Sequence, residues 1–312
     1  MKLFLGVDGG QSGTMAVIGD ENGRVLGTGE AGPCNHAAAG EGRAKLQRAV
    51  MGSVAGACAQ ADLDAETVSF EAGCFGMSGG PEDKRELLAA ILRVQHLLVT
   101  NDAVIALAGA TRTGQGIITI AGTGSIAFGR NPEGRSARAG GWGYIFGDEG
   151  GGFDIARQAL RAMLRLDEGW GQPTALRQMF LAATDCKDAN QMLHLFYTDE
   201  WPRSRVATLA PLVDDAAAQG DPVALAILRG AAQQLAMLAG AVREQLWTPG
   251  AMVEIAYIGG VFQSQVLLDN FRSLTELHEG VRTGAPWRGP AEGALREAYR
   301  LVGLEWTEEL AL

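Results

Sequence analysis

The sequence predicts an α/β fold divided into two domains, and three observations lead to that prediction. A chain of 312 residues favours two domains over one. Residues 2–29 and 116–130 each have the pattern of a strand, a glycine-rich turn and a returning strand. Each of these units opens a segment in which predicted strands and helices alternate. A duplicated architecture is the simplest explanation, and it places the boundary near residues 110–114.

Short apolar runs that lead into turns rich in Gly, Ser, Asn or Asp predict the strands of the first domain. These runs cover residues 2–8, 14–19, 24–29, 67–77 and 96–100. Apolar or small residues at helical spacing predict its helices. These segments cover residues 40–61, 82–93 and 103–111.

The second domain is predicted to combine strands with a long helical region. Its strands are expected over residues 116–121, 125–130 and 253–258. The chain from 173 to 248 has a mainly helical pattern, with breaks near Trp201-Pro202 and Gly220-Asp221-Pro222.

The last segment, residues 290–304, is an amphipathic pattern that predicts a final helix. We expect it to pack back on the first domain, because a sheet of that size needs another cover. The predicted domains are therefore residues 1–112 with 289–312, and residues 113–288.

Composition excludes several classes of partner. The net charge of -10 and a pI near 5.0 argue against nucleic acid or an anionic membrane, since both need a basic surface. The four cysteines are scattered and form no CxxC pair, which is typical of a reducing cytoplasm. The apolar run in MKLFLGVDGG is too short for a signal peptide or a membrane span. We therefore expect a cytoplasmic protein with no membrane or nucleic-acid partner.

The first glycine turn, GVDGGQSGT, has a form that suits phosphate oxygens, because small residues between two strands present consecutive N–H groups. Asp8, at the end of the strand, is suited to hold Mg²⁺ through water. The candidate phosphate-binding residues are Gly10, Gln11, Ser12, Gly13 and Thr14. The motif is neither a P-loop nor a Rossmann fingerprint, and a plain hairpin with an Asp in its turn is the alternative.

The second turn, IAGTGS, repeats this form around Thr123 and Gly124. One such turn alone is compatible with an ordinary hairpin, but two turns at corresponding positions predict a site that holds a polyphosphate between them. A third motif, YIGGV, places Gly259 and Gly260 between a strand and a helix, where backbone can approach a flat ring such as adenine. A tight strand-to-helix connection is the alternative there.

Thr100-Asn101-Asp102-Ala103 follows a predicted strand and offers a carboxylate for general base catalysis. A phosphoryl acceptor needs a base that takes or orients its hydroxyl proton. Taken alone, the motif favours a helix cap at Thr100, Asn101 or Asp102. Together with two phosphate turns, it points to Asp102 as the base, with a neighbour as the cap.

The stretch from Gly140 to Leu160, GGWGYIFGDEGGGFDIARQAL, combines many glycines with aromatic residues and a pair of carboxylates, Asp148 and Glu149. Carboxylates accept hydrogen bonds from hydroxyl groups, and aromatic faces such as Trp142 cover a sugar ring, so a polyol site is indicated. A structural Ω-loop with an acidic turn is the alternative. Asn35 with His36, and Ser78 with Gly79, are further polar loops suited to sugar hydroxyls, and a structural or exposed histidine is the alternative for His36.

In this order, GVDGGQSGT, MSGG, TNDA, IAGTGS, GGWGYIFGDEGGG and YIGGV resemble the N-acetylglucosamine kinase branch of the BadF/BadG/BcrA/BcrD ATPase family. That family belongs to the actin, Hsp70 and sugar kinase superfamily. The resemblance runs from about residue 3 to 300. It implies a two-domain actin-like ATPase fold of the ribonuclease H type with an interdomain cleft, the use of ATP and Mg²⁺, and transfer of the γ-phosphate to a sugar 6-hydroxyl. It also implies a homodimer.

The resemblance implies roles for individual residues. Asp102 resembles the catalytic base, Gly10–Thr14 the first phosphate loop, Thr123-Gly124 the second, and Gly259-Gly260 the adenosine site. The residues that resemble sugar contacts are Asn35, His36, Ser78, Gly79, Asp102, Gly141, Trp142, Gly143, Asp148 and Glu149. The chain departs from the family pattern at Gly151-Gly152, where relatives often carry Ser, and at Ala37–Ala39, where no aromatic follows His36.

The expected function is therefore an ATP-dependent kinase of an amino sugar, with N-acetylglucosamine first, and glucosamine or N-acetylmuramic acid as alternatives. Some relatives are ATPases that activate a redox enzyme through a bridging iron–sulfur cluster, which needs close cysteines. The scattered cysteines here give no such arrangement. A sugar sensor would need a DNA-binding segment or a damaged catalytic base, and a zinc-bearing ROK kinase would need a cysteine cluster. The sequence offers none of these features.

Overall fold

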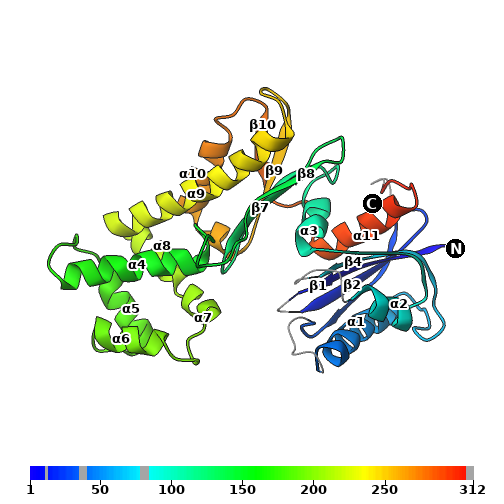
Figure 1. Ribbon diagram of the computed structural model, residues 1–312, viewed down its shortest axis with the longest axis horizontal. Helices are drawn as coiled ribbons and strands as arrows, with labels where there is room; N and C mark the ends of the chain where they lie inside the picture. Colours follow the sequence, from blue (N-terminus) through cyan, green and yellow to red (C-terminus); the bar gives the residue numbers. More distant parts are fainter. Residues whose placement is uncertain (11–12, 35–40, 78–83, 307–312) are drawn as a thin grey trace. The chain divides into compact units, whose positions relative to one another are not determined.

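The computed structural model describes residues 1–10, 13–34, 41–77 and 84–306 (Figure 1). Contacts divide the chain into two compact units. Unit 1 contains Met1–Gln115 and Pro286–Leu312, and unit 2 contains Gly116–Ala285. Each unit is built around one mixed five-stranded sheet, so the predicted α/β class is confirmed.

The sheet of unit 1 has the order β3-β2-β1-β4-β5. Its first three strands form an antiparallel meander, and β1, β4 and β5 run parallel. The strands are β1 (Leu3–Gly9), β2 (Thr14–Asp20), β3 (Val25–Ala31), β4 (Phe70–Met77) and β5 (Val94–Thr100). Residues of β1 alternate between the two faces, with Leu3, Leu5 and Val7 in one core cluster and Phe4 in the other.

Helices cover both faces of this sheet (Figure 1). One face carries α1 (Glu41–Gln60) and α2 (Arg85–Ile91), and the other carries α3 (Asp102–Ala110) and α11 (Pro290–Leu301). Helix α11 approaches β1 so closely that a Cβ at Gly6 would lie 2.2 Å from the Leu295 nitrogen. The Arg296 guanidinium donates to the carbonyl oxygens of Ala108 and Thr111, both at 2.7 Å, and so satisfies the end of α3.

The sheet of unit 2 has the order β10-β9-β6-β7-β8. Strand β6 is central, antiparallel to β7 and parallel to β9. The strands are β6 (Gly116–Ala121), β7 (Ser125–Arg130), β8 (Ser136–Gly140), β9 (Val253–Ile258) and β10 (Val281–Gly284). Both units thus begin with a strand, a tight turn and an antiparallel partner strand, which is the duplication that the sequence predicts.

Unit 2 is the more helical of the two. Its helices are α4 (Gly152–Asp167), α5 (Leu176–Thr184), α6 (Ala189–Phe196), α7 (Arg203–Ala207), α8 (Ala210–Ala218), α9 (Pro222–Leu246), the 3₁₀ helix η1 (Gly260–Gln263) and α10 (Gln265–Thr275). Helix α9 packs across β6, β7 and β8 and against α10. Among the described residues, α9 is the one helix long and apolar enough to cross a membrane. That is weak evidence for a span, since the core helix of a protein without one passes the same test.

The sequence missed two strands, β8 and β10. Strand β8 has the sequence Ser-Ala-Arg-Ala-Gly and lies at a sheet edge, half exposed, so it lacks the apolar run that marks an internal strand. Strand β10 has four residues and lies at the opposite edge. Both strands are short and contain few large apolar residues, so neither has the hydrophobic pattern that predicts a strand.

Some predicted boundaries were also wrong. The strand expected from residue 67 begins at Phe70, because the N–H groups of Thr67 and Val68 donate to the Asp64 carbonyl in a turn. The final helix ends at Leu301, and not at residue 304, because Gly303 adopts φ +75 and the Leu304 N–H donates back to Tyr299. The start of the helix expected from residue 82 lies outside the described residues.

Candidate functional site

The turn between β6 and β7 has the hydrogen-bond pattern of an anion-binding nest. The Gly122 N–H donates to the Gly124 carbonyl at 3.0 Å. The first two N–H groups of α4, from Gly152 and Phe153, donate to the carbonyls of Gly122 and Thr123 at 2.7 and 3.1 Å. The N–H groups of Thr123 and Gly124 donate to no atom of the described chain. With every carbonyl of the turn occupied and these N–H groups available, the turn is suited to phosphate oxygens.

This turn opens into a cavity of about 560 Å³ within unit 2. The cavity brings Thr123 together with Gly260, so one predicted phosphate turn and one predicted adenosine residue share a single pocket. The remaining walls come from α4, from α7 and the residues after it, from α8, from α9, and from η1 and the residue after it: Gly152, Ile155, Ser204, Ala207, Thr208, Ala210, Pro211, Asp214, Asp215, Leu228, Val261, Gln263 and Ser264. Such a volume suits a nucleoside with its first phosphates.

Gly259 shapes the pocket without lining it. It adopts φ +115, and a Cβ there would lie 2.2 Å from the Ala121 carbonyl oxygen. Only glycine fits this combination of conformation and close approach. The turn after β9 is thereby held against the end of β6, which places Gly260 at the pocket.

The pocket contains polar side chains that the sequence did not indicate. Asp214 on α8 accepts a hydrogen bond from the Ser264 hydroxyl, and Ser264 also caps α10 through the Leu267 N–H. A pair of acidic residues within a helix is typical of a solvated surface, so Asp214 and Asp215 carried no motif signal. Fifty residues separate Asp214 from Ser264, so their contact depends on tertiary packing.

The first glycine turn lies in unit 1 and is closed by two backbone hydrogen bonds. The Gly10 N–H donates to the Gly13 carbonyl at 2.9 Å, and the Cys34 N–H donates to the Gly10 carbonyl at 3.3 Å. Thr14 is 2% exposed, and its hydroxyl donates to the Gly32 carbonyl at 2.9 Å. The structure therefore gives Thr14 an anchoring contact within the unit. Gln11 and Ser12 lie outside the described residues.

Asp8 and Asp102 interact electrostatically near the ends of neighbouring elements. Asp8 on β1 pairs in register with Gly76 on β4, which pairs with Thr100 on β5. A Cβ at Gly76 would lie 2.2 Å from an Ile105 side-chain carbon, so α3 packs directly on β4. This close packing brings the start of α3, where Asp102 lies, to the end of the sheet that carries Asp8.

The cap of α3 is Asn101, whose side-chain oxygen accepts from the Val104 N–H at 3.0 Å. The exposed Asp102 carboxylate is therefore not the group that caps the helix. Burial first, and the charge of Asp102 second, raise the pKa of Asp8 from 3.8 to about 6. A divalent cation beside Asp8 would relieve both effects, so Asp8 fits a role in holding Mg²⁺. Within the described residues, including this region, no three His, Cys, Asp or Glu side chains come together as a metal site.

The glycine-rich loop between β8 and α4 exposes its aromatic residues. Trp142 is 64% exposed, and the Arg138 guanidinium lies 4.3 Å from the centroid of its ring. Gly141 and Gly143 have φ values of +70 and +78. Asp148 is 6% exposed, with φ +64, and it accepts from the Arg203 guanidinium at 2.6 Å. Glu149 is half-buried, and its carbonyl accepts from the Ser125 hydroxyl at 2.6 Å.

Four further predicted sugar contacts, Asn35, His36, Ser78 and Gly79, lie outside the described residues. Three of the four cysteines, Cys34, Cys58 and Cys74, are buried, and Cys186 is half-buried.

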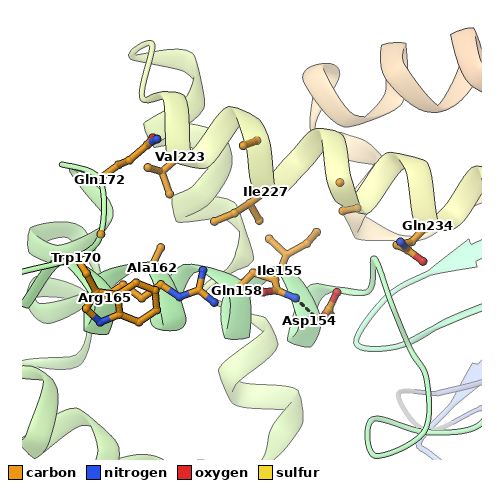
Figure 2. Close-up of a pocket in the computed structure, with 14 residues that line it drawn as sticks. Asp154, Ile155, Gln158, Ala162, Arg165, Trp170, Gln172, Val223, Ile227 and Gln234 are labelled. Carbon is orange, nitrogen blue, oxygen red and sulfur yellow. Dashed lines mark hydrogen bonds between the residues drawn. The ribbon is translucent and has the colours of Figure 1, made fainter. Parts of the chain in front are cut away.

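A second cavity of unit 2, of about 520 Å³, lies between α4 and α9 (Figure 2). Gln158 and Asp154 from α4 face Ile227 and Gln234 from α9, and Trp170 closes one end. None of the predicted site residues lines it. The cavity at Thr123 and Gly260 is therefore the candidate nucleotide pocket.

Comparison with known proteins agrees with this geometry. Residues 5–296 match the BadF/BadG/BcrA/BcrD ATPase family. The chain belongs to this family.

Two curated relatives are N-acetyl amino-sugar kinases by name. The chain is 35% identical over 286 residues to the N-acetylmuramic acid/N-acetylglucosamine kinase of Clostridium acetobutylicum, covering 89% of this chain and 92% of the relative. It is 32% identical over 255 residues to the N-acetyl-D-glucosamine kinase of Dictyostelium discoideum, covering 75% of this chain and 77% of the relative.

Solved structures of the same fold include a protein from Chromobacterium violaceum that is provisionally named as an N-acetylglucosamine kinase. It matches with a TM-score of 0.74 and 29% identity over 95% of this chain and 98% of that one. A ROK family glucokinase from Streptomyces griseus matches with a TM-score of 0.54 and 22% identity, over 95% and 98% of the two chains. The glucokinase shows a shared fold.

Proposed function

We propose that this member of the family is an ATP-dependent amino-sugar kinase that transfers the γ-phosphate to the 6-hydroxyl of N-acetylglucosamine. The observation that carries the proposal is the pocket in which an open anion nest at Thr123-Gly124 meets Gly260 and the Asp214–Ser264 pair. The named activities of the two curated relatives support the same acceptor class.

In the proposed reaction, a bond forms between the sugar 6-oxygen and the γ-phosphorus, and the bond from the γ-phosphorus to the bridging oxygen breaks, releasing ADP. Asp102 accepts the proton of the hydroxyl as the new bond forms. The N–H groups of Thr123 and Gly124 hold phosphate oxygens. Asp8 is the residue that would hold Mg²⁺, and the cation would neutralise developing phosphate charge.

At the other end of the nucleotide, Asp214 is placed to accept hydrogen bonds from a ribose or base donor, because Ser264 fixes its carboxylate. Ala207, Pro211 and Val261 offer apolar surface for the adenine ring. The pocket therefore has both the polar and the apolar elements that a nucleoside needs.

Asp214→Asn is expected to raise the KM for ATP about tenfold with little change in the KM for the sugar, because one charged acceptor is lost from the pocket. Steady-state kinetics with each substrate varied in turn measures this. Asp199→Asn, which removes the same charge from an exposed residue outside the pocket, is the control and should behave as wild type. An unchanged KM for ATP in Asp214→Asn would remove this residue from the nucleotide site.

The acceptor is tested with an ADP-release assay over N-acetylglucosamine, glucosamine, N-acetylmuramic acid and glucose. We expect the highest kcat/KM with N-acetylglucosamine. N-acetylmuramic acid is the second candidate, since the Clostridium relative is named for both sugars. ADP release no faster than the ATP-only background with every sugar would overturn the proposed function.

We further propose that the enzyme works in the cytoplasm as a homodimer. The absence of disulfides among the four cysteines supports a cytoplasmic location, and the net charge of -10 argues against nucleic-acid partners. Light scattering on the purified protein measures the oligomeric state, and a monomer across the working concentration range would contradict the dimer.

A further inference from the structure

Arg203 lies at the first position of α7 and contacts two residues of the loop that connects β8 to α4. Its guanidinium donates to the Asp148 carboxylate at 2.6 Å. The same guanidinium lies 5.3 Å from the centroid of the Tyr144 ring. The two contacts hold the loop at two points, one ionic and one over an aromatic face. The sequence gives no sign of this link, since 55 residues separate Arg203 from Asp148.

Asp148 also contacts the turn around Thr123 and Gly124, which is the predicted phosphate turn of unit 2. Its carboxylate also accepts from the Ser125 N–H at 3.4 Å, and a Cβ at Gly124 would lie 2.4 Å from a carboxylate oxygen. Asp148 adopts φ +64 and is 6% exposed, so its carboxylate needs a partner to stay in place. Arg203 is the charged partner that the structure provides. The position of the Gly124 turn therefore depends on the Arg203–Asp148 pair.

The other side of α7 borders the nucleotide pocket. Ser204 and Ala207 from the helix, and Thr208 directly after it, line the cavity that contains Thr123. One five-residue helix thus contacts both the nucleotide pocket and the loop that carries Trp142 and Glu149. A nucleotide that fixes α7 would fix Arg203, and through Arg203 it would fix the loop.

We propose that Arg203 is a positioning residue that couples the nucleotide pocket to the glycine-rich loop, so that bound nucleotide orders the loop and strengthens sugar binding. The effect on the sugar depends on the proposed function, whereas the effect on the loop does not. The coupling lies within unit 2 and uses contacts that the structure shows directly. A contribution to folding alone would stabilise the protein without linking the two sites.

Trp142 in the glycine-rich loop can report on the conformation of that loop. Trp142 is largely exposed and stacks with Arg138, so a change in the loop should change its fluorescence. We would record the change on adding a non-hydrolysable ATP analogue, and assign it by difference with Trp142→Phe. Four proteins are compared: wild type, Arg203→Met, Arg203→Lys and Arg205→Met. Arg205 is a matched control, because it lies on the same helix but contacts Trp201 and the Glu200 carbonyl.

Wild type and Arg205→Met are expected to show the Trp142 response, Arg203→Met to lose it, and Arg203→Lys to retain part of it through the charge. The ratio of sugar Kd without and with the analogue should fall about tenfold in Arg203→Met, which removes a charged contact. If Arg203→Met does not fold, Asp148→Asn removes the same pair from the loop side, with the same expected losses.

A wild type without a Trp142 response, or a full response in both Arg203→Met and Asp148→Asn, would overturn the coupling. A lower melting temperature in Arg203→Met with wild-type response and Kd ratio would reduce Arg203 to a structural role and overturn it as well. Turnover separates the two claims. An active wild type with intact coupling in Arg203→Met contradicts only this inference, whereas a Trp142 response in a wild type that phosphorylates no sugar contradicts only the proposed function.

Discussion

Asp102→Asn is expected to lower kcat about 10³-fold, because a positioned general base contributes roughly 10²–10⁴ to such a transfer. The side chain keeps its size but no longer accepts the hydroxyl proton. Binding of ATP and sugar should change little, since Asp102 is exposed at the start of α3 and does not cap the helix. Isothermal titration for binding, with a coupled ADP assay for turnover, measures both parts.

The neighbouring residue gives the control for this experiment. Asn101 caps α3 through the Val104 N–H, so Asn101→Ala should cost about 1 kcal/mol of stability and affect kcat far less. Asn101→Asp should preserve the cap. If Asp102→Asn turned over within threefold of wild type, the base would have to be another group. If it lost sugar binding altogether, its role would be recognition and not proton transfer.

Asp8→Asn is expected to stabilise the ligand-free protein at neutral pH. Burial and the charge of Asp102 raise the Asp8 pKa from 3.8 to about 6, so the folded state resists ionising this group more than the unfolded state does. The unfolding free energy of wild type therefore falls as pH rises from about 4 to about 6, and it remains lowered at higher pH. The Asn variant lacks this penalty. We expect it to be about 2 kcal/mol more stable at pH 7 and equally stable near pH 4.

The same substitution should reduce activity about 100-fold, because the residue that would hold Mg²⁺ is lost. Added Mg²⁺ and ATP should stabilise wild type more than the variant. Urea unfolding at pH 4, 5.5 and 7 without nucleotide or metal measures the first effect, and the ADP assay measures the second. Glu66→Gln removes an exposed charge from the same unit and serves as the control. If the difference in unfolding free energy between Asp8→Asn and wild type were constant between pH 4 and pH 7, the raised pKa of Asp8 would not be its cause.

Much of the fold could be predicted because its signals are local. The strand runs 2–8, 14–19, 116–121 and 125–130 appear in the structure as β1, β2, β6 and β7, with glycine turns between the partners of each pair. Strands β8 and β10 could not be predicted, since polar, short edge strands have no apolar pattern. The site shows the same division. Thr123 and Gly260 were indicated by their turns, whereas Asp214 and Arg203 belong to helices whose polar residues look like ordinary surface.

What the sequence determined by itself is the chemistry of its turns. The glycines around Thr123 and Gly10, and the carboxylates at Asp8 and Asp102, follow apolar strands, and that order predicts an ATP-dependent kinase of this family. Only the tertiary structure decided which groups meet. The Asp214–Ser264 and Arg203–Asp148 contacts join residues 50 and 55 positions apart. They form because α7 packs on α4, and α8 packs on α4 and α9. Local backbone preference is encoded within a few residues, but such contacts are fixed by the burial of whole helices.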